Sequence, residues 1–231
     1  MSEILKLDNI CYSYIDGGYE RQILKNLSYS FEAGTFYTIL GASGSGKTTL
    51  LSILAGLDSA KSGDIFFEGR NVKEIGLYKY RRNMISIVFQ QYNLIPYLTA
   101  VENVMVAMAE TDNDLPKDKK AVAYNLLEKF GIVKTKADRL VSQLSGGEQQ
   151  RVSIARALAS NVNLIFADEP TGNLDTATEK EIITVFEELA HEFGKTVIVV
   201  THSEAVSKLS DHRVFLKNGI LTDLDDQSDN K

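Results

Sequence analysis

Short apolar runs alternate with amphipathic stretches along most of the chain. Three runs, at residues 36–40, 164–167 and 196–200, are rich in aliphatic and β-branched side chains. Each run leads into a turn or the start of a helix. Continuous apolar strands of this length are typical of a parallel sheet that is buried on both faces by helices.

Three amphipathic segments predict helices that cover this sheet. They span residues 47–55, 147–160 and 176–193. In the last segment Ile182, Ile183, Val185, Phe186 and Leu189 form an apolar stripe with helical spacing. We therefore expect an α/β core in which strands and helices alternate along the chain.

The N-terminal part has a different pattern. Residues 5–14 and 27–31 read as strands separated by a Gly-containing loop at 16–20, and residues 64–67 add another short strand. This pattern predicts an antiparallel β-sheet that flanks the core.

The middle of the chain, from about residue 101 to 139, is mostly helical in pattern and contains a polar stretch with Pro116. We treat residues 1–231 as one domain. Its core with the antiparallel sheet covers about 1–90 and 160–222, and an inserted helical subdomain covers about 91–159. The polar, acidic tail at 223–231 is expected to be disordered.

Composition narrows the possible partners. The 231 residues carry a net charge of -6, which argues against a nucleic-acid partner, because such proteins need a clustered basic face. The single cysteine cannot form an internal disulfide, as suits a reducing cytosol. No apolar run approaches the roughly 20 residues that span a bilayer. The charged N-terminus is unlike a signal peptide, so any work at a membrane requires a partner protein.

The strongest chemical signal follows the run at 36–40. The letters GASGSGKT match the phosphate-binding pattern G-x-x-x-x-G-K-[ST], with a strand before it and a helix after it. Glycines let backbone N–H groups point at a β-phosphate, and the helix N-terminus favours an anion. Lys47 is expected to reach the β- and γ-phosphates, and Thr48 to ligate Mg²⁺. The predicted ATP-binding residues here are Gly41, Ala42, Ser43, Gly44, Ser45, Gly46, Lys47, Thr48 and Thr49.

Two acids end the run at 164–167. Carboxylates at the C-terminal edge of a parallel strand lie where ligands bind in open α/β sheets. Asp168 is therefore expected to hold the Mg²⁺ shell, and Glu169 to orient and polarise the attacking water. The alternative, a solvated acidic turn, is the usual interpretation of an Asp-Glu pair that has no phosphate loop beside it.

His202 follows the run at 196–200, so we expect it at the same sheet edge. There it would contact the γ-phosphate and stabilise developing charge, with Glu169 and Lys47 as the other catalytic residues. An isolated histidine in this position is more often structural.

A second anion site precedes the helix at 147–160. The letters LSGGE place two glycines at a helix start, with the Ser145 hydroxyl as a further donor. A phosphate loop already satisfies its own nucleotide, so a second site needs an explanation. A head-to-tail dimer supplies one, in which Ser145, Gly146, Gly147 and Glu148 cap the γ-phosphate held by the other subunit.

Together these residues resemble the ATP-binding cassette ATPases over roughly residues 3–222. The motifs occur in family order: Walker A at 41–49, the Q-loop at Gln90, the signature LSGGEQQR at 144–151, Walker B at 164–168 followed by Glu169, the D-loop at 173–175, and the switch residue His202. The resemblance implies a P-loop NTPase core of the RecA-like type with a parallel sheet, an N-terminal antiparallel β subdomain and an inserted helical subdomain.

The resemblance also implies roles for residues that spacing alone does not assign. Gln90 is similar to the family residue that binds Mg²⁺ and senses the membrane partner. Asp175 looks like the residue that makes a cross-dimer contact. The aromatic residue that stacks on adenine is expected to be Tyr14, with Tyr12 as the alternative.

Two segments resemble one branch of the family. Residues 89–104 and 168–175 look like macrolide exporters, lipoprotein-releasing transporters, antimicrobial-peptide exporters and the cell-division ATPase FtsE. Residues 141–143 depart from the commoner proline-containing approach to the signature and say nothing about the branch.

By this resemblance the chain is an ATP-hydrolysing homodimer on the cytoplasmic face of the cell membrane. It would drive export or extraction of a peptide, drug or lipoprotein through a separate permease. An FtsE-like regulator of cell-wall enzymes and a compact importer ATPase remain alternatives. The short stretch after His202 favours an exporter, because many importers of the family carry an extra C-terminal domain. Cassette proteins that act on DNA or ribosomes usually have two fused cassettes or long coiled-coil insertions, which this chain lacks.

Overall fold

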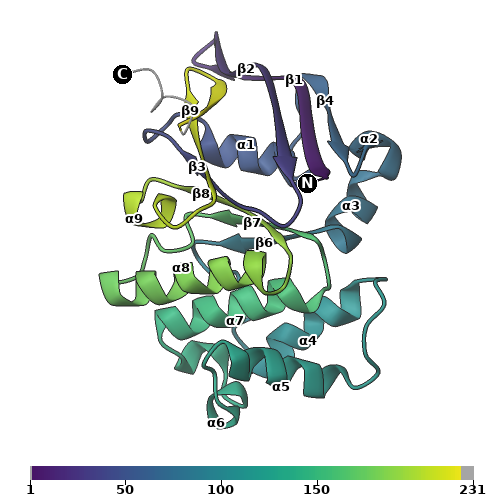
Figure 1. The fold of residues 1–231 in the computed structure, drawn as a ribbon, viewed down its shortest axis with the longest axis vertical. Coiled ribbons are helices and arrows are strands. Elements are labelled where there is room, and N and C mark those ends of the chain that lie inside the picture. The colour runs from purple at the N-terminus through teal and green to yellow at the C-terminus, as the bar shows by residue number, and fades with distance from the viewer. Residues whose placement is uncertain (1, 225–231) are drawn as a thin grey trace.

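Two β-sheets with helices between and beside them make up the fold (Figure 1). The structure, a computed structural model, describes residues 2–224. The larger sheet has six strands in the order β10-β9-β3-β8-β7-β6. These strands are β3 (Phe36–Leu40), β6 (Ile85–Phe89), β7 (Leu164–Asp168), β8 (Thr196–Thr201), β9 (His212–Lys217) and β10 (Ile220–Asp223). All neighbouring pairs are parallel except β9 with β10.

The register of the parallel strands aligns their C-terminal ends. Leu40 of β3 pairs with Thr201 of β8, and Asp168 of β7 pairs with Val200 of β8. On the other side of β7, Phe89 of β6 pairs with Asp168. The segments that follow these four strands therefore begin at one edge of the sheet, where open α/β sheets bind ligands.

The sequence pattern did not predict β6, β9 and β10. In β9 buried and exposed residues alternate, and β10 has only four residues, so neither has a continuous apolar run. The strand β6, with the letters ISIVF, does have such a run and is detectable by the same criterion.

The smaller sheet is antiparallel, as predicted, with the order β2-β1-β4-β5. Its strands are β1 (Glu3–Asp16), β2 (Tyr19–Glu32), β4 (Ser62–Phe67) and β5 (Arg70–Asn71). The strands β1 and β2 are longer than expected and leave a tight turn at Gly17 and Gly18. Both glycines have positive φ, which suits a residue without a Cβ.

The helix α1 lies between the two sheets, and α7 and α8 cover the opposite face of the larger sheet (Figure 1). Beyond α7 lie α4, α5 and α6. The helices are α1 (Lys47–Leu54), α2 (Val72–Ile75), α3 (Leu77–Asn83), α4 (Ala100–Glu110), α5 (Lys119–Lys129), α6 (Lys134–Ala137), α7 (Gly146–Ala159), α8 (Thr176–His191) and α9 (Glu204–Ser207), with a 3-10 turn at Val141–Gln143.

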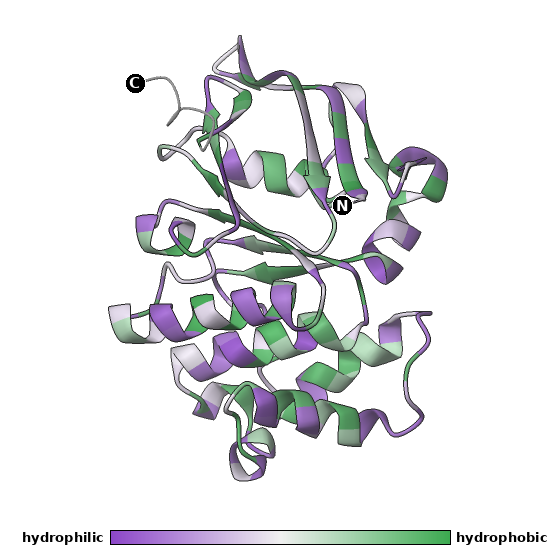
Figure 2. Ribbon diagram, in the orientation of Figure 1, coloured by the Kyte–Doolittle hydropathy of each residue, from purple (hydrophilic) through white to green (hydrophobic). Residues whose placement is uncertain are grey.

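Two apolar cores lie on opposite faces of the larger sheet. Ile165 and Val197 pack with the helices α4 to α8, whereas Phe166 and Ile198 pack with α1 and the antiparallel sheet. Successive residues of one strand point to opposite faces, so both positions must be apolar. This explains the continuous apolar runs that predicted these strands, which appear green in Figure 2.

The helices of residues 91–159 share their core with one face of the larger sheet. Val101 and Leu127 belong to the same buried cluster as Ile165. The division of the chain into a core and an inserted helical subdomain remains a prediction.

The C-terminal end of the described chain is a hairpin. Asp223, which we expected in the disordered tail, pairs with Val214 at the end of β10, and the backbone N–H of Leu224 donates to the carbonyl of Arg213. Residues 225–231 of the predicted tail lie outside the described residues. Among residues 2–224, no helix has both the length and the apolar character needed to cross a bilayer.

Candidate active site

The loop from Gly41 to Gly46 joins the end of β3 to the start of α1. Gly46 precedes the helix with φ 98°, a left-handed conformation, and a Cβ there would lie 2.4 Å from Cγ2 of Ile23. A Cβ on Gly41 would lie 2.8 Å from the carbonyl oxygen of Leu216. Backbone conformation and close packing thus explain both fixed glycines of the motif.

Lys47 directly follows this loop and is buried, with 8% of its surface exposed. Its Nζ donates to the carbonyl oxygens of Gly41 at 2.9 Å and Ala42 at 3.3 Å. A carboxylate oxygen of Glu169 lies 4.0 Å from the same nitrogen. A buried ammonium needs such partners, and together they hold its charge beside the loop.

Asp168 ends β7 opposite the first turn of α1. The Thr48 hydroxyl donates to Oδ1 of Asp168 across 3.3 Å. Burial raises the pKa of Asp168 above its usual range, and the neighbouring Glu169 charge adds to this effect. A bound cation would reverse the balance and favour the ionised carboxylate.

Glu169 has φ 45°, an unusual conformation for a residue with a side chain. Its backbone N–H donates to the carbonyl of Val200 at 2.9 Å. The Oε2 atom of Glu169 accepts from the backbone N–H of His202 at 3.3 Å and lies 2.9 Å from His202 Nδ1. The carboxylate of Glu169 therefore lies between Lys47 and His202. Residues with a strained backbone cluster at functional sites, and the φ of Glu169 fits that pattern.

A cleft of about 340 Å³ runs along this loop. Tyr14 of β1 lines it and is 40% exposed, so its ring is available to a ligand. The alternative, Tyr12, instead donates its hydroxyl to Asp58 at 2.6 Å, and it does not line this cleft. The described lining residues are Tyr14, Ile23, Ser43, Gly44, Gly46, Lys47, Thr48, Thr49 and Glu169.

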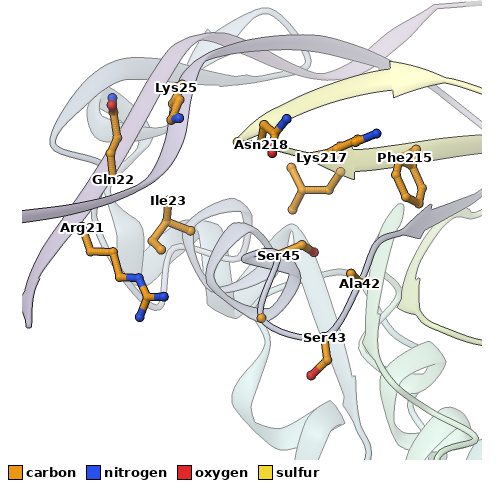
Figure 3. A pocket seen from close by; sticks show the side chains of 13 residues that line it. Arg21, Gln22, Ile23, Lys25, Ala42, Ser43, Ser45, Phe215, Lys217 and Asn218 are labelled. Carbon is orange, nitrogen blue, oxygen red and sulfur yellow. The ribbon is translucent and has the colours of Figure 1, made fainter.

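A second cavity of about 540 Å³ lies between β2, the phosphate loop and the β9–β10 hairpin (Figure 3). It shares Ser43 and Gly44 with the first cleft. Arg21, Lys25 and Lys217 line it, and among the described lining residues there is no acid. The positive charge on this flank favours the approach of a polyphosphate.

Gln90 follows β6 at the same sheet edge but is not among the described residues that line the cleft. Its Nε2 donates to Oδ1 of Asn173 at 3.1 Å, and Nδ2 of Asn173 donates to the Gln90 carbonyl at 3.3 Å. This reciprocal pair joins the segment after β6 to the segment before α8.

The signature residues form the start of α7. Ser145 caps the helix: its hydroxyl accepts from the Glu148 N–H at 3.3 Å, and the Glu148 carboxylate accepts from the Ser145 N–H at 2.9 Å. A hydrogen bond from Lys136 of α6 lowers the pKa of Glu148, and the bond from the Ser145 backbone acts in the same direction.

Close neighbours explain the two glycines of the signature. A Cβ on Gly147 would lie 2.3 Å from Cγ2 of Thr178, and one on Gly146 would lie 2.8 Å from the Tyr92 hydroxyl. None of the residues 145–148 lines the phosphate-loop cleft. Within one chain the signature therefore contributes no residue to the lining of the phosphate-loop cleft.

Asp175 caps α8, which begins at Thr176. Its Oδ1 accepts from the N–H groups of Ala177 and Thr178, and its Oδ2 accepts from the Thr178 hydroxyl at 2.7 Å. The bond from the Thr178 side chain lowers the pKa of Asp175, and the backbone bond from Thr178 has the same effect. The D-loop acid thus has a local structural role in addition to any role between subunits.

Sequence reasoning missed three residues around this site. Ile23 covers Gly46, Lys136 holds Glu148, and Asn173 holds Gln90. The position of Ile23 near the phosphate loop depends on packing between sheets. The contact of Asn173 with Gln90 joins segments 83 positions apart, and the contact of Lys136 with Glu148 joins α6 to α7. Only the position of Asn173 in the D-loop gave a signal.

A glycine loop between a strand and a helix, a buried lysine at the start of that helix and two acids at the end of a neighbouring strand define a P-loop nucleotide hydrolase. The sequence profile of the ABC transporter family matches residues 24–172. The chain belongs to this family and is the ATP-binding and ATP-hydrolysing subunit of an ABC transporter.

Relatives cover almost the whole chain. The ABC transporter ATP-binding protein YclH of Bacillus subtilis is 46% identical over 95% of this chain and 96% of its own length. The lipoprotein-releasing system ATP-binding protein LolD of Aquifex aeolicus is 44% identical over 95% and 96%. Among solved structures, the dimeric ADP- and Pi-bound cassette MJ0796 of Methanocaldococcus jannaschii superposes with a TM-score of 0.85 at 37% identity, over 96% of this chain and 99% of that one. The predicted family and fold are thus confirmed.

The ion pair between Lys136 and Glu148 predicts a pH-dependent contribution to stability. Because the pKa of Glu148 is lowered in the folded chain, the pair stabilises above the unfolded pKa of about 4.3. This contribution is lost as the pH falls through the lower folded pKa. Lys136→Met should therefore lower the melting temperature at pH 7 relative to wild type, and the difference should shrink towards pH 3. Differential scanning calorimetry across this range tests it, with the exposed Lys79→Met as control. A difference that is the same at every pH would contradict the assignment.

Proposed function

We propose that the chain acts as a homodimer in which each ATP lies between the phosphate loop of one subunit and the signature of the other. The observation that carries this proposal is the separation of residues 145–148 from the phosphate-loop cleft within one chain. The N-terminus of α7, a helix of 14 residues, offers N–H groups and a favourable dipole to an anion. A second copy, placed head to tail, would bring that helix end to the γ-phosphate.

In this proposal the residues around Glu169 carry out hydrolysis. Glu169 accepts a proton from the attacking water and orients it. Lys47 holds the β- and γ-phosphates, which draw its ammonium away from the carbonyls of Gly41 and Ala42. His202, whose imidazole lies against Glu169 and is 71% exposed, contacts the γ-phosphate and stabilises developing charge. Asp175, which lies at the start of α8, would contact the other subunit of the dimer.

The chemistry of the proposed ligands fits a magnesium ion. The Thr48 hydroxyl, the Asp168 carboxylate and the Gln90 amide provide only oxygen ligands, which Mg²⁺ prefers. Among residues 2–224, no cluster of three or more His, Cys, Asp or Glu forms a metal cage. Mg²⁺ usually binds through one or two carboxylates together with substrate phosphates, so a site with one acid suits it. The bound ion would neutralise phosphate charge.

We further propose that the dimer works at the cytoplasmic face of the membrane on a separate permease, and exports or extracts a peptide, drug or lipoprotein. Support comes from the similarity to LolD, whose name states a role in lipoprotein release. The region near Gln90 and the helical subdomain of about 91–159 would transmit closure of the dimer to the permease. FtsE-like regulation and a compact importer remain the alternatives.

Glu169→Gln tests the role of Glu169 and the dimer together. The amide keeps the shape of the side chain but cannot accept a proton, so phosphate release should fall by about 100-fold or more. The variant should accumulate as an ATP-bound dimer, measured by size-exclusion chromatography with light scattering. Wild type with ADP serves as the monomer control. A variant that stays monomeric at saturating ATP would contradict the dimer.

Tyr14→Ala tests the proposed adenine contact. Base–aromatic stacking contributes about 1–3 kcal/mol, so the Kd for ATP should rise about 5- to 150-fold. Tyr14→Phe keeps the ring and should bind nearly as wild type. Fluorescence titration with a labelled ATP analogue measures both. Tyr12→Ala is the matched control on the same strand, and an equal or larger effect there would favour Tyr12 instead.

Copurification from the native host tests the membrane partner. We expect tagged Glu169→Gln, held closed by ATP, to retain an integral membrane protein after gentle solubilisation. A permease with four spanning helices and a large extracytoplasmic domain would support export or lipoprotein release. A cell-division protein would favour the FtsE-like role, and retention of no membrane protein at all would contradict a stable transporter complex.

A further inference from the structure

Glu179 lies in the first turn of α8 and links two segments of the site. Its Oε1 atom accepts a hydrogen bond from the Thr171 hydroxyl at 3.2 Å and another from the Ser203 hydroxyl at 2.8 Å. Both donors are thus held by one oxygen atom of one side chain. A carboxylate in the first helical turn is itself stabilised by the helix dipole.

The two donors belong to the segments that carry the reacting side chains. Thr171 lies two residues after Glu169, and Ser203 directly follows His202. The same two segments are also joined by the 2.9 Å contact between Glu169 Oε2 and His202 Nδ1. A cavity of about 280 Å³ is lined by both pairs, so Glu179 forms one wall of the space beside the reacting groups.

We propose that Glu179 is a positioning residue for ATP hydrolysis, which holds the Glu169 segment and the His202 segment at a fixed separation. This inference rests on the roles proposed above for Glu169 and His202. Glu179 is not among the residues that line the phosphate-loop cleft, so it acts through Glu169 and His202 and leaves nucleotide binding unaffected.

The position of Glu179 on α8 also connects it to the D-loop. Asp175 caps the same helix one turn earlier. One helix start therefore carries both the D-loop acid and the oxygen that accepts from Thr171 and Ser203.

The acceptor oxygen can be tested apart from the charge. Glu179→Ala removes Oε1 and should lower kcat about 10- to 100-fold, the range expected when reacting groups are misplaced by a fraction of an ångström to about 1 Å. The Kd for ATP should stay within twofold. Glu179→Gln keeps an oxygen acceptor without the charge and should restore kcat to within threefold of wild type. Glu187→Ala, on the same helix, is the matched control.

A second route reaches the same contact from the donor side. Thr171→Val keeps the shape of the side chain but removes the hydroxyl, and should lower kcat less than Glu179→Ala does. The double variant should be no slower than Glu179→Ala alone, because both changes remove one interaction. Thermal melting shows which variants are folded, and Thr171→Val decides the matter if Glu179→Ala does not fold.

Several outcomes would overturn the inference: unchanged kcat in Glu179→Ala, equal loss in Glu179→Gln, or a matching rise in the Kd for ATP. Glu169→Gln is measured in the same series. If Glu169→Gln retains turnover, the proposed base is wrong. If Glu169→Gln is inactive while Glu179→Ala is fully active, only the role of Glu179 fails.

Discussion

The parallel register of β6, β7, β8 and β3 is the constraint on which the site depends. Because these strands run in one direction and end level with one another, the segments after them meet at one edge. Gly41, Gln90, Glu169 and His202 come from positions as far as 161 residues apart in the chain, yet each follows directly on one of these strands. A shift of one residue in any pair would displace a reacting side chain by about 3.3 Å.

Charge at this edge is balanced by few groups. The ammonium of Lys47 lies among two carbonyls and the Glu169 carboxylate, while Asp168 has a raised pKa because it is partly buried next to another acid. Glu169 itself has a left-handed backbone. Two close acids and a strained residue reduce stability, as is common where a site is arranged for a ligand. A bound divalent cation would relieve this repulsion.

Several motif residues also build the local structure. Ser145 and Asp175 cap α7 and α8, and Glu148 completes the capping box with Ser145. The signature glycines permit close contact with Tyr92 and Thr178. A substitution at any of these positions changes a helix start as well as a surface that faces the proposed second subunit. Activity loss alone therefore does not separate the two roles, and measurements of dimer formation are needed beside it.

The sequence alone determined the fold class, the antiparallel sheet, the phosphate loop and the acids at the end of β7. These features depend on local patterns: continuous apolar runs, helical stripes and glycines at fixed spacing. Gly46 is required locally, because the residue before α1 has a left-handed backbone conformation. A requirement of this kind can be recognised from the sequence of one short segment.

Only the tertiary structure decided which side chains meet. Tyr14 lines the phosphate-loop cleft, whereas the Tyr12 hydroxyl is held by Asp58, 46 positions away. The link through Glu179 joins three segments, and β9 and β10 become strands by pairing rather than by their own apolar pattern. Contacts between distant segments depend on how the elements pack, and a local pattern carries no information about that packing.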